Sequence, residues 1–358
     1  MGSRVRGNDD LPLFSRFPSC ALAVALVASA ATAAEPEVID AKVWGSGVSL
    51  AAPTWLDARR VLFLSASGFK PNEQRRALAI WELDGKASGY RDNVNHYCYR
   101  DGTLVYKVLD PADAGMVRGT WYAGKVGSEQ PVRKDAGGNV ARLYDPLNCR
   151  IATNEELQKR PERGMIPLLE KHGYLDPRSG QVPGLPRNTP VQYVRAADKA
   201  AVKLPFGSRE FNPAATYFEF ADSYLIRSVY YDETKRATVF PWPAQLERPA
   251  WLLKPDGAVT RQIIPKGSWT GKDDPALYLT RAGLVLVRHG GTLERADGVY
   301  LAEGSNVRHL LAGRAGPVGV SADGCSIAFT HAPSAENDAE DANNRRTLKV
   351  MRLCASKS

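Results

Sequence analysis

The residues with the clearest chemical potential are the cysteines. The chain contains five, and four of them, Cys98, Cys149, Cys325 and Cys354, follow the first 34 residues. No pair among these four has the Cys-x-x-Cys spacing of a zinc or redox site, which argues against both chemistries. An even number of cysteines in an exported chain favours disulfide bonds, and four cysteines allow three pairings.

The histidines and the carboxylate pairs carry weaker signals. The five histidines are His96, His172, His289, His309 and His331, and none lies in a His-Glu-x-x-His or His-x-His arrangement. We expect them at the surface or at strand ends. Neither a Gly-x-Ser-x-Gly elbow nor a phosphate-binding glycine loop occurs. The sequence therefore predicts no catalytic, cofactor-binding or metal-binding residue, and no cofactor.

Three further stretches have both a functional and a structural interpretation. Residues 336–344 are rich in oxygen ligands but lack the spacing of a calcium loop, so we expect a hairpin loop. Trp242, Trp251 and Trp269 could bind sugars or a peptide if exposed, but we expect them in the core. The adjacent carboxylates Glu155-Glu156 and Asp273-Asp274 are typical of solvated loops.

The first 34 residues are typical of a signal peptide. Cys20 to Ala31 is an uncharged run of small and apolar residues, preceded by Arg16 and followed by small residues up to Ala34. This run is too short to span a membrane, and no second apolar stretch approaches eighteen residues. We predict a signal peptide at 1–34 and one mature domain at 35–358, which is soluble and periplasmic or secreted.

Composition places the mature chain among ordinary globular proteins, with 44% apolar and 24% charged residues. The formal net charge is +8, and charges of both signs are interspersed along the chain. We interpret the excess of positive charge as a solubility property and expect no nucleic-acid partner. The alternative is a basic surface that meets anionic lipid, lipopolysaccharide or nucleic acid.

From Val38 onward the pattern is one of short strands separated by turn signals. Clear examples are Val61 to Leu64, Thr103 to Val108, Val259 to Ile264 and Leu284 to Arg288. We also expect strands at Tyr217 to Phe220 and Tyr224 to Tyr231, and either a strand or a helix at Met165 to Tyr174. Val38 to Trp44 should pair with a strand of the C-terminal unit. Thr153 to Glu156 resembles a capping box that begins a brief helix. Equivalent strands recur at about forty-odd residues, as expected of four-stranded propeller blades, and roughly seven such units fit the length. Six or eight blades remain open.

Residues 318–331 carry the most specific motif. The turn Ser321-Ala322-Asp323-Gly324 precedes a strand of Ile-Ala-Phe type. This pattern resembles the TolB-type, WD40-like β-propeller family, although alanine stands where the family repeat has proline. The resemblance implies an all-β fold with one propeller. It implies no particular function, because such propellers include interaction proteins and the non-catalytic propellers of peptidases.

The hairpin logic of the last unit predicts a specific disulfide. Cys325 opens the strand after the Asp323-Gly324 turn, and Cys354 closes the returning strand. Neighbouring antiparallel strands lie about 5 Å apart, which is within disulfide reach. We predict a Cys325–Cys354 bond, and a Cys98–Cys149 bond by elimination. The alternative is four buried free thiols.

Two functions follow as hypotheses. The first is a non-catalytic binding or scaffold propeller of the cell envelope, with an envelope protein or a glycan as its partner. The second is an exported enzyme, of glycoside hydrolase or lyase type, whose residues are dispersed among the loops of the propeller. A cluster of His, Asp or Glu with shifted pKa values would favour the enzyme.

Overall fold

The computed structural model describes most of the chain after residue 34. The described residues are 35–46, 51–66, 76–83, 85–111, 118–135, 144–158, 164–178, 188–239, 242–243, 246–265, 275–288, 297–333 and 345–354. The predicted signal peptide at 1–34 lies outside them, as do His289, Trp269, Asp273-Asp274 and the acidic stretch 336–344. Residues 35–358 form one compact unit.

Strands dominate this unit, as the sequence predicts. In the first half they are β1 (Glu37–Ser46), β2 (Thr54–Trp55), β3 (Arg60–Ser65), β4 (Arg76–Glu82), β5 (Ala87–Arg100), β6 (Thr103–Leu109), β7 (Gly119–Lys125), β8 (Gln130–Asp135), β9 (Tyr144–Asp145), β10 (Arg150–Ile151), β11 (Ile166–Pro167), β12 (Gly173–Asp176) and β13 (Pro190–Arg195). The second half contains β14 (Ala201–Gly207), β15 (Phe211–Phe218), β16 (Ser223–Ser228), β17 (Tyr230–Asp232), β18 (Ala237–Val239), β19 (Arg248–Leu253), β20 (Val259–Ile264), β21 (Ala276–Thr280), β22 (Gly283–Arg288), β23 (Gly298–Glu303), β24 (Asn306–Ala312), β25 (Arg314–Ala315), β26 (Gly319–Val320), β27 (Ser326–Ala332) and β28 (Arg345–Arg352).

The single α-helix of the described residues begins where the capping box predicts it. Helix α1 spans Asn154–Gln158. The backbone nitrogen of Thr153 donates to Oε2 of Glu156 at 2.7 Å, and the backbone nitrogen of Glu156 donates to Oγ1 of Thr153 at 3.2 Å. These reciprocal bonds satisfy two N–H groups that the first turn of a helix leaves without an intrahelical partner.

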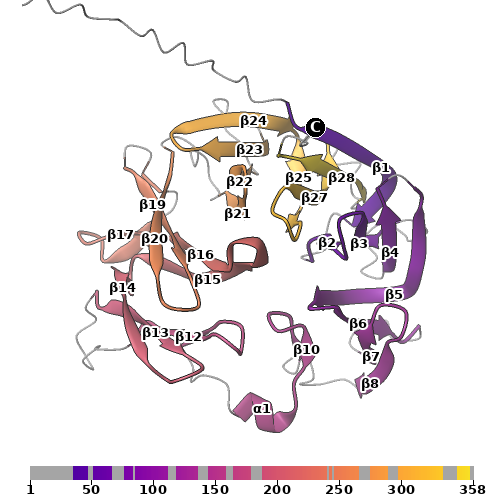
Figure 1. Ribbon diagram of the computed structural model, residues 1–358, viewed down its shortest axis with the longest axis horizontal. Coiled ribbons are helices and arrows are strands. Elements are labelled where there is room, and N and C mark those ends of the chain that lie inside the picture. The colour runs from indigo at the N-terminus through magenta and orange to yellow at the C-terminus, as the bar shows by residue number, and fades with distance from the viewer. Residues whose placement is uncertain are drawn as a thin grey trace, which may run out of the picture. The chain divides into compact units, whose positions relative to one another are not determined.

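Antiparallel four-stranded sheets follow one another along the chain (Figure 1). Their strand orders are β11-β12-β13-β14, β15-β16-β19-β20 and β21-β22-β23-β24, and the hairpin β17-β18 is inserted in the second. A longer hydrogen-bonded path runs β25-β27-β28-β1-β3-β4-β5-β6-β7-β8, while β9 and β10 form a two-stranded sheet. Successive antiparallel sheets of this size are the arrangement predicted for propeller blades.

Strand β1 pairs with the last strand of the chain. Glu37 lies opposite Arg352, and Ser46 lies opposite Arg345, with an irregularity between Asp40 and Trp44. The pairing of Val38 to Trp44 with a C-terminal strand is thus confirmed. It covers an edge of β28 that would otherwise present unpaired backbone groups.

Apolar clusters pack most sheets against the next one. One cluster joins β13 to β19 through Tyr193 and Trp251, and another joins β16 to β22 through Leu225 and Leu286. A third joins β22 to β27, and a fourth joins β28 to β3. Because each fully buried aliphatic or aromatic side chain contributes about 1.5–3 kcal/mol, these interfaces supply most of the stability. Trp242 and Trp251 are buried, as predicted.

The Ser321–Gly324 turn shows why the repeat motif uses these residues. The hydroxyl of Ser321 donates to Oδ1 of Asp323 and accepts from the backbone nitrogen of Ser326. Oδ1 of Asp323 also accepts from the backbone nitrogen of Cys325 at 2.9 Å. Gly324 has a φ of 72°, in the left-handed region that glycine tolerates best. These bonds start β27 in a fixed register.

Both disulfide bonds form with the pairings predicted from the sequence. Cys325 and Cys354 lie with their Cα atoms 5.1 Å apart, at the end where β27 and β28 meet. Cys98, on β5, bonds to Cys149, just before β10, with a Cα separation of 5.5 Å. The second bond therefore ties the two-stranded β9-β10 sheet to the sheet that contains β5.

Three segments differ from the predicted elements. Residues 165–174 form neither one strand nor one helix, but two short strands, β11 and β12, joined by a turn at Leu169–Gly173. The predicted strand Tyr224–Tyr231 breaks at Val229 into β16 and β17. Strand β15 ends at Phe218, and Glu219–Ala221 form a turn of 3-10 helix. Two of these departures present side chains to the site described next.

Candidate ligand site

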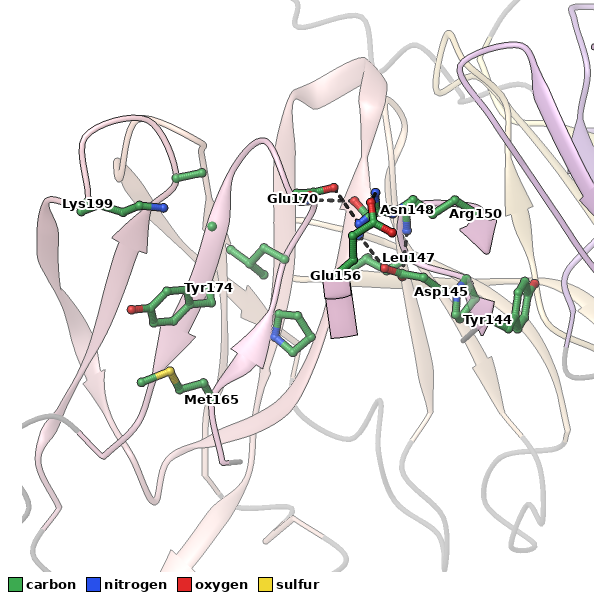
Figure 2. Close-up of a pocket in the computed structure, with 15 residues that line it drawn as sticks. Tyr144, Asp145, Leu147, Asn148, Arg150, Glu156, Met165, Glu170, Tyr174 and Lys199 are labelled. Carbon is green, nitrogen blue, oxygen red and sulfur yellow. Dashed lines mark hydrogen bonds and ion pairs between the residues drawn. The ribbon is translucent and has the colours of Figure 1, made fainter. Parts of the chain in front are cut away.

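A pocket of about 680 Å³ lies where the β9-β10 region meets the β11-β12 sheet (Figure 2). We call it the inter-sheet pocket. It is lined by Tyr144, Asp145, Pro146, Leu147, Asn148, Arg150, Glu156, Met165, Pro167, Leu168, Glu170, Gly173, Tyr174, Ala196 and Lys199. Among the described residues, the only side chain of the β9-β10 region packed into the apolar cluster of β11–β14 is Leu147. An open pocket with several charged groups therefore stands where the other sheet boundaries have an apolar core.

The polar groups of the inter-sheet pocket are held in place by one another. Arg150 forms ion pairs of 2.9 Å with both Glu156, on α1, and Glu170, on the turn after β11. The amide nitrogen of Asn148 donates to Oδ2 of Asp145 at 3.0 Å, and its Oδ1 accepts from the backbone nitrogen of Glu170 at 2.8 Å. Figure 2 shows these contacts bridging the two sides of the pocket. Such fixed geometry lowers the entropy cost of binding.

Aromatic and apolar groups form the rest of the wall. The Tyr144 ring stacks on Trp121 of β7 with a centroid distance of 4.7 Å. Burial, with a smaller effect from the Asp145 carboxylate, raises the pKa of Tyr144. Tyr174 and Met165 lie on the opposite side, away from the ion pairs (Figure 2). Apolar walls with a few fixed polar groups are typical of small-molecule sites.

Two smaller hollows continue from this pocket. The first, which we call the Lys171 hollow, measures about 390 Å³ and shares Asn148, Arg150 and Glu170 with the inter-sheet pocket. Its other lining residues are Arg100, Asp101, Leu169 and Lys171. A second hollow, of about 240 Å³, shares Arg100 and Asp101 with it and extends to Trp55, Tyr217 and Ser321. Side chains from several sheets thus face one connected surface.

The turn Leu169–Gly173 presents Glu170 and Lys171 to this surface and is rigidly anchored. Tyr224 of β16 accepts a hydrogen bond from the backbone nitrogen of Leu169 at 2.9 Å. Tyr193 of β13 donates to the carbonyl oxygen of His172 at 2.7 Å. Gly173 has a φ of 117°, and a Cβ there would collide with the carbonyl oxygen of Val194. Buried hydroxyls and one obligatory glycine therefore fix the turn.

His172 lies in this turn, where its ring contacts two tyrosines. Its Nδ1 is 2.8 Å from the hydroxyl of Tyr224, and its ring meets the Tyr217 ring edge-on at 5.3 Å. Burial lowers the pKa of His172, and the Lys171 charge lowers it further. The nearby Asp222 opposes this effect, and Arg100 adds to it. At neutral pH the imidazole is therefore neutral.

Arg100 and Tyr217 make further polar contacts beside His172. The Tyr217 hydroxyl donates to Oδ1 of Asp222 at 2.6 Å, and burial together with this carboxylate raises the pKa of Tyr217. The Arg100 guanidinium lies over the Tyr217 ring at 5.8 Å. Asp222 adopts a φ of 43°, a left-handed conformation that aspartate tolerates better than most residues.

The residues singled out in the sequence have mixed outcomes. The structure brings the four cysteines together in two pairs, and none of the four lines the inter-sheet pocket. His331 is buried within β27 and its Nε2 lies 2.7 Å from the carbonyl oxygen of Ala312, so it is a core residue and not a surface one. His309 stacks on Tyr300 with centroids 4.5 Å apart. Of the carboxylates considered, Glu156 reaches the inter-sheet pocket.

Sequence reasoning missed the residues that meet at this site. Arg100, Arg150 and His172 come from three separate regions of strand pairing, and no local spacing links them. Tyr217 and Tyr224 are cross-strand partners in a fourth region, the β15-β16 hairpin. The only available signal was the capping box, which places Glu156 beside Arg150. In the described ranges, no group of three His, Cys, Asp or Glu side chains could hold a metal ion. No helix of the described residues is long and apolar enough to cross a membrane.

Comparisons with known proteins return solved structures of low similarity to this chain. Neither a protein-family model nor a curated protein matches the chain. Similar solved structures include an oligogalacturonate lyase from Vibrio parahaemolyticus (8% identity, 91% of this chain and 100% of that chain, TM-score 0.43). They also include TolB from Acinetobacter baumannii (11% identity, 82% and 64%, TM-score 0.33) and an acylaminoacyl peptidase from Pyrococcus horikoshii (10% identity, 81% and 43%, TM-score 0.31).

The fold itself is all-β, with successive antiparallel sheets of the size expected for propeller blades. The predicted number of blades, about seven, stays a prediction. Because their identity to this chain is only 8–11%, these structures carry no information about its function.

Proposed function

We propose that this protein is a non-catalytic binding propeller of the cell envelope whose ligand occupies the inter-sheet pocket. The observation that carries this proposal is the replacement of an apolar sheet boundary by a pocket with pre-positioned polar groups. A boundary that only had to be stable would gain more from apolar packing there, because partly exposed ion pairs such as those of Arg150 contribute little to stability. The Arg150 ion pairs and the open volume are thus better explained by binding.

Two further observations support the envelope location. The predicted signal peptide would direct the chain out of the cytoplasm. Two disulfide bonds, Cys98–Cys149 and Cys325–Cys354, suit an oxidising compartment. The partner would then be an envelope protein or a glycan.

The test is capture of partners by residues 35–358 from envelope extract, together with binding to a glycan panel. Tyr174→Ala removes an aromatic wall of the inter-sheet pocket and should weaken binding at least fivefold. Tyr231→Ala is the matched control, since Tyr231 is half-buried, contacts Arg209 and lies outside the pocket. Equal binding by both variants and the unchanged protein would place the site elsewhere.

A second candidate function is favoured by one specific observation, the neutral His172 beside Tyr217 and Asp222. The neutral imidazole can take up a proton at Nδ1 through the Tyr224 hydroxyl, and propeller loops can assemble dispersed catalytic groups. In this case the protein is an exported enzyme that cleaves a glycan by hydrolysis or elimination. Incubation with the same glycan panel decides between the two, because product formation that His172→Asn abolishes would reject a purely binding role.

A further inference from the structure

We propose that the Lys171 hollow binds a carboxylate group of the ligand and that Arg100 is its main anion-binding residue. This inference rests on the proposed binding function and adds to it the chemical class of the ligand. It extends the site from the inter-sheet pocket into the neighbouring hollow, which shares Arg150 and Glu170 with it.

Arg100 has hydrogen-bonding capacity that the protein leaves unused. Its Nη1 is 3.5 Å from Oε1 of Glu219, at the outer limit of a hydrogen bond. Its Nε is buried and has no hydrogen-bond partner among the described residues. A buried donor without a partner is costly, so an arrangement of this kind is retained where a ligand completes it.

The position of the guanidinium suits a carboxylate in particular. Only 22% of the Arg100 side chain is exposed, so its charge is weakly screened by water. The guanidinium carbon also lies 5.8 Å from the centroid of the Tyr217 ring, and this cation–π contact helps to position the group. A guanidinium edge matches the two oxygens of a carboxylate, which it binds through paired hydrogen bonds.

Lys171 adds a second positive charge to the lining of the same hollow. Its turn is fixed by Tyr224 and Tyr193, and among the described residues it has no ion pair or hydrogen bond. The third cation of the hollow, Arg150, is already neutralised by Glu156 and Glu170. Arg100 and Lys171 are therefore the two cations with capacity for an incoming anion.

Asp101 is the residue whose charge opposes binding of a carboxylate in this hollow. Its carboxylate lines the same hollow, follows Arg100 directly in the chain, and has no ion pair among the described residues. It would repel an incoming carboxylate but would attract an ammonium group. Asp101→Asn therefore shows whether the ligand of the hollow is an anion or a cation. The substitution should strengthen binding of an anion and weaken binding of a cation.

The experiment is calorimetric titration of residues 35–358 with two matched pairs of probes. D-glucuronate is compared with D-glucose, and N-acetylglutamate with N-acetylglutamine, so that one carboxylate is the main difference within each pair. We expect the acidic member of at least one pair to bind at least tenfold more tightly. The pair that responds shows whether a sugar or a peptide supplies the carboxylate. No preference in either pair would overturn the proposal.

Variants then locate the interaction. Arg100→Gln should lower the affinity for the preferred acidic probe by roughly 10- to 100-fold, the range expected for hydrogen bonds to a charged group. Arg100→Lys keeps the charge and should recover only part of the loss. Lys171→Ala should weaken binding a few-fold, whereas Lys203→Ala, an exposed lysine on β14, should have no effect. Circular dichroism and the melting temperature check that each variant is folded.

These experiments distinguish failure of the carboxylate proposal from failure of the proposed binding function. If partner or glycan capture depends on Tyr174 but neither acidic probe is preferred, the proposed binding function is supported. The proposal that the ligand carries a carboxylate is then rejected. If Arg100→Gln leaves the affinity unchanged while an acidic probe is preferred, or if Asp101→Asn weakens that probe, the assignment to Arg100 and this hollow is wrong.

Discussion

The hydroxyl of Tyr224 lies 2.8 Å from Nδ1 of His172 and 2.9 Å from the backbone nitrogen of Leu169. The backbone N–H can only donate, so the Tyr224 oxygen accepts from it. The single phenolic proton is then available to Nδ1, and we predict that Nδ1 accepts it. In that arrangement His172 carries its own proton on Nε2 and is the neutral tautomer.

The first prediction concerns this tautomer. Long-range ¹H–¹⁵N spectra at pH 7.5 should show Nδ1 of His172 unprotonated and Nε2 protonated. Tyr224→Phe should lower the free energy of unfolding by about 1–3 kcal/mol, because the buried N–H of Leu169 and Nδ1 of His172 both lose a partner. A protonated Nδ1 in the unchanged protein would contradict the assigned hydrogen-bond direction.

The second prediction is a loss of stability in mild acid. Burial is the main cause of the lowered pKa values of His172 and His331. An unfolded histidine titrates near 6.5, so below this pH the unfolded chain binds more protons than the folded one. The stability that these neutral rings contribute is complete above about pH 6.5 and is lost as the pH falls toward their folded pKa values.

Urea unfolding at pH 7.5, 6.5 and 5.5 measures this effect. His172→Asn should reduce the decrease between pH 6.5 and 5.5, since Asn does not titrate and its side-chain oxygen can accept from Tyr224. His309→Gln is the control, because His309 lies on the exposed side of β24. An identical pH dependence for His172→Asn and the unchanged protein would show that His172 is not a source of the acid sensitivity.

The features that the sequence predicts are those set by residues close together along the chain. Strands such as β20 (Val259–Ile264) and the turn at Ser321–Gly324 follow from local alternation and turn chemistry, and both are observed. The Cys325–Cys354 pairing follows from one hairpin, which is still local. By contrast, Arg100 and Tyr217 meet through packing of separate sheets. Nothing in the neighbourhood of either residue specifies that contact.

Very short strands are also difficult to predict from the sequence. Ile166–Pro167 and Gly173–Asp176 are too brief to express a period, so the pattern of residues 165–174 cannot separate strand from helix. Their register depends on the tyrosine hydroxyls of β13 and β16 that anchor the intervening turn. The rigid presentation of Lys171 is thus a tertiary property.

The third prediction concerns the Cys325–Cys354 disulfide. The bond closes a loop with a sequence separation of 29, for which chain-entropy arguments give about 3–4 kcal/mol. Replacing both cysteines by serine should lower the free energy of unfolding by about this amount, measured in urea. The Cys98–Cys149 bond, with a separation of 51, should contribute about 4 kcal/mol in the same assay. A change under about 1 kcal/mol for either pair would show that its loop is constrained by other contacts.

The fourth prediction concerns export. We expect cleavage after Ala34, so that Glu35 becomes the N-terminus of the mature protein. Intact-mass and N-terminal peptide measurements on protein recovered outside the cytoplasm test this directly. Recovery of the apolar run Cys20 to Ala31 in that protein would contradict the predicted signal peptide.

The fifth prediction is that β1 is required to complete the propeller. Its side chains Ile39, Ala41 and Val43 pack against the apolar cluster of β3, β4 and β28. Deletion of residues 37–46 would remove this packing and leave an edge of β28 unpaired, which favours association between chains. We expect a lower melting temperature and aggregation, measured by thermal scanning and light scattering.

The matched control removes charge from β1 and β28 without removing the strand. Glu37 and Arg352 form a cross-strand ion pair of 2.9 Å in which both side chains are largely exposed. Exposed pairs contribute about 0–1 kcal/mol, so Glu37→Gln with Arg352→Gln should change stability little and leave the protein monomeric. If the deletion behaves like this control, backbone pairing and apolar contacts of β1 would not be what holds the last sheet together. If only the deletion aggregates, the β1–β28 pairing is the structural requirement.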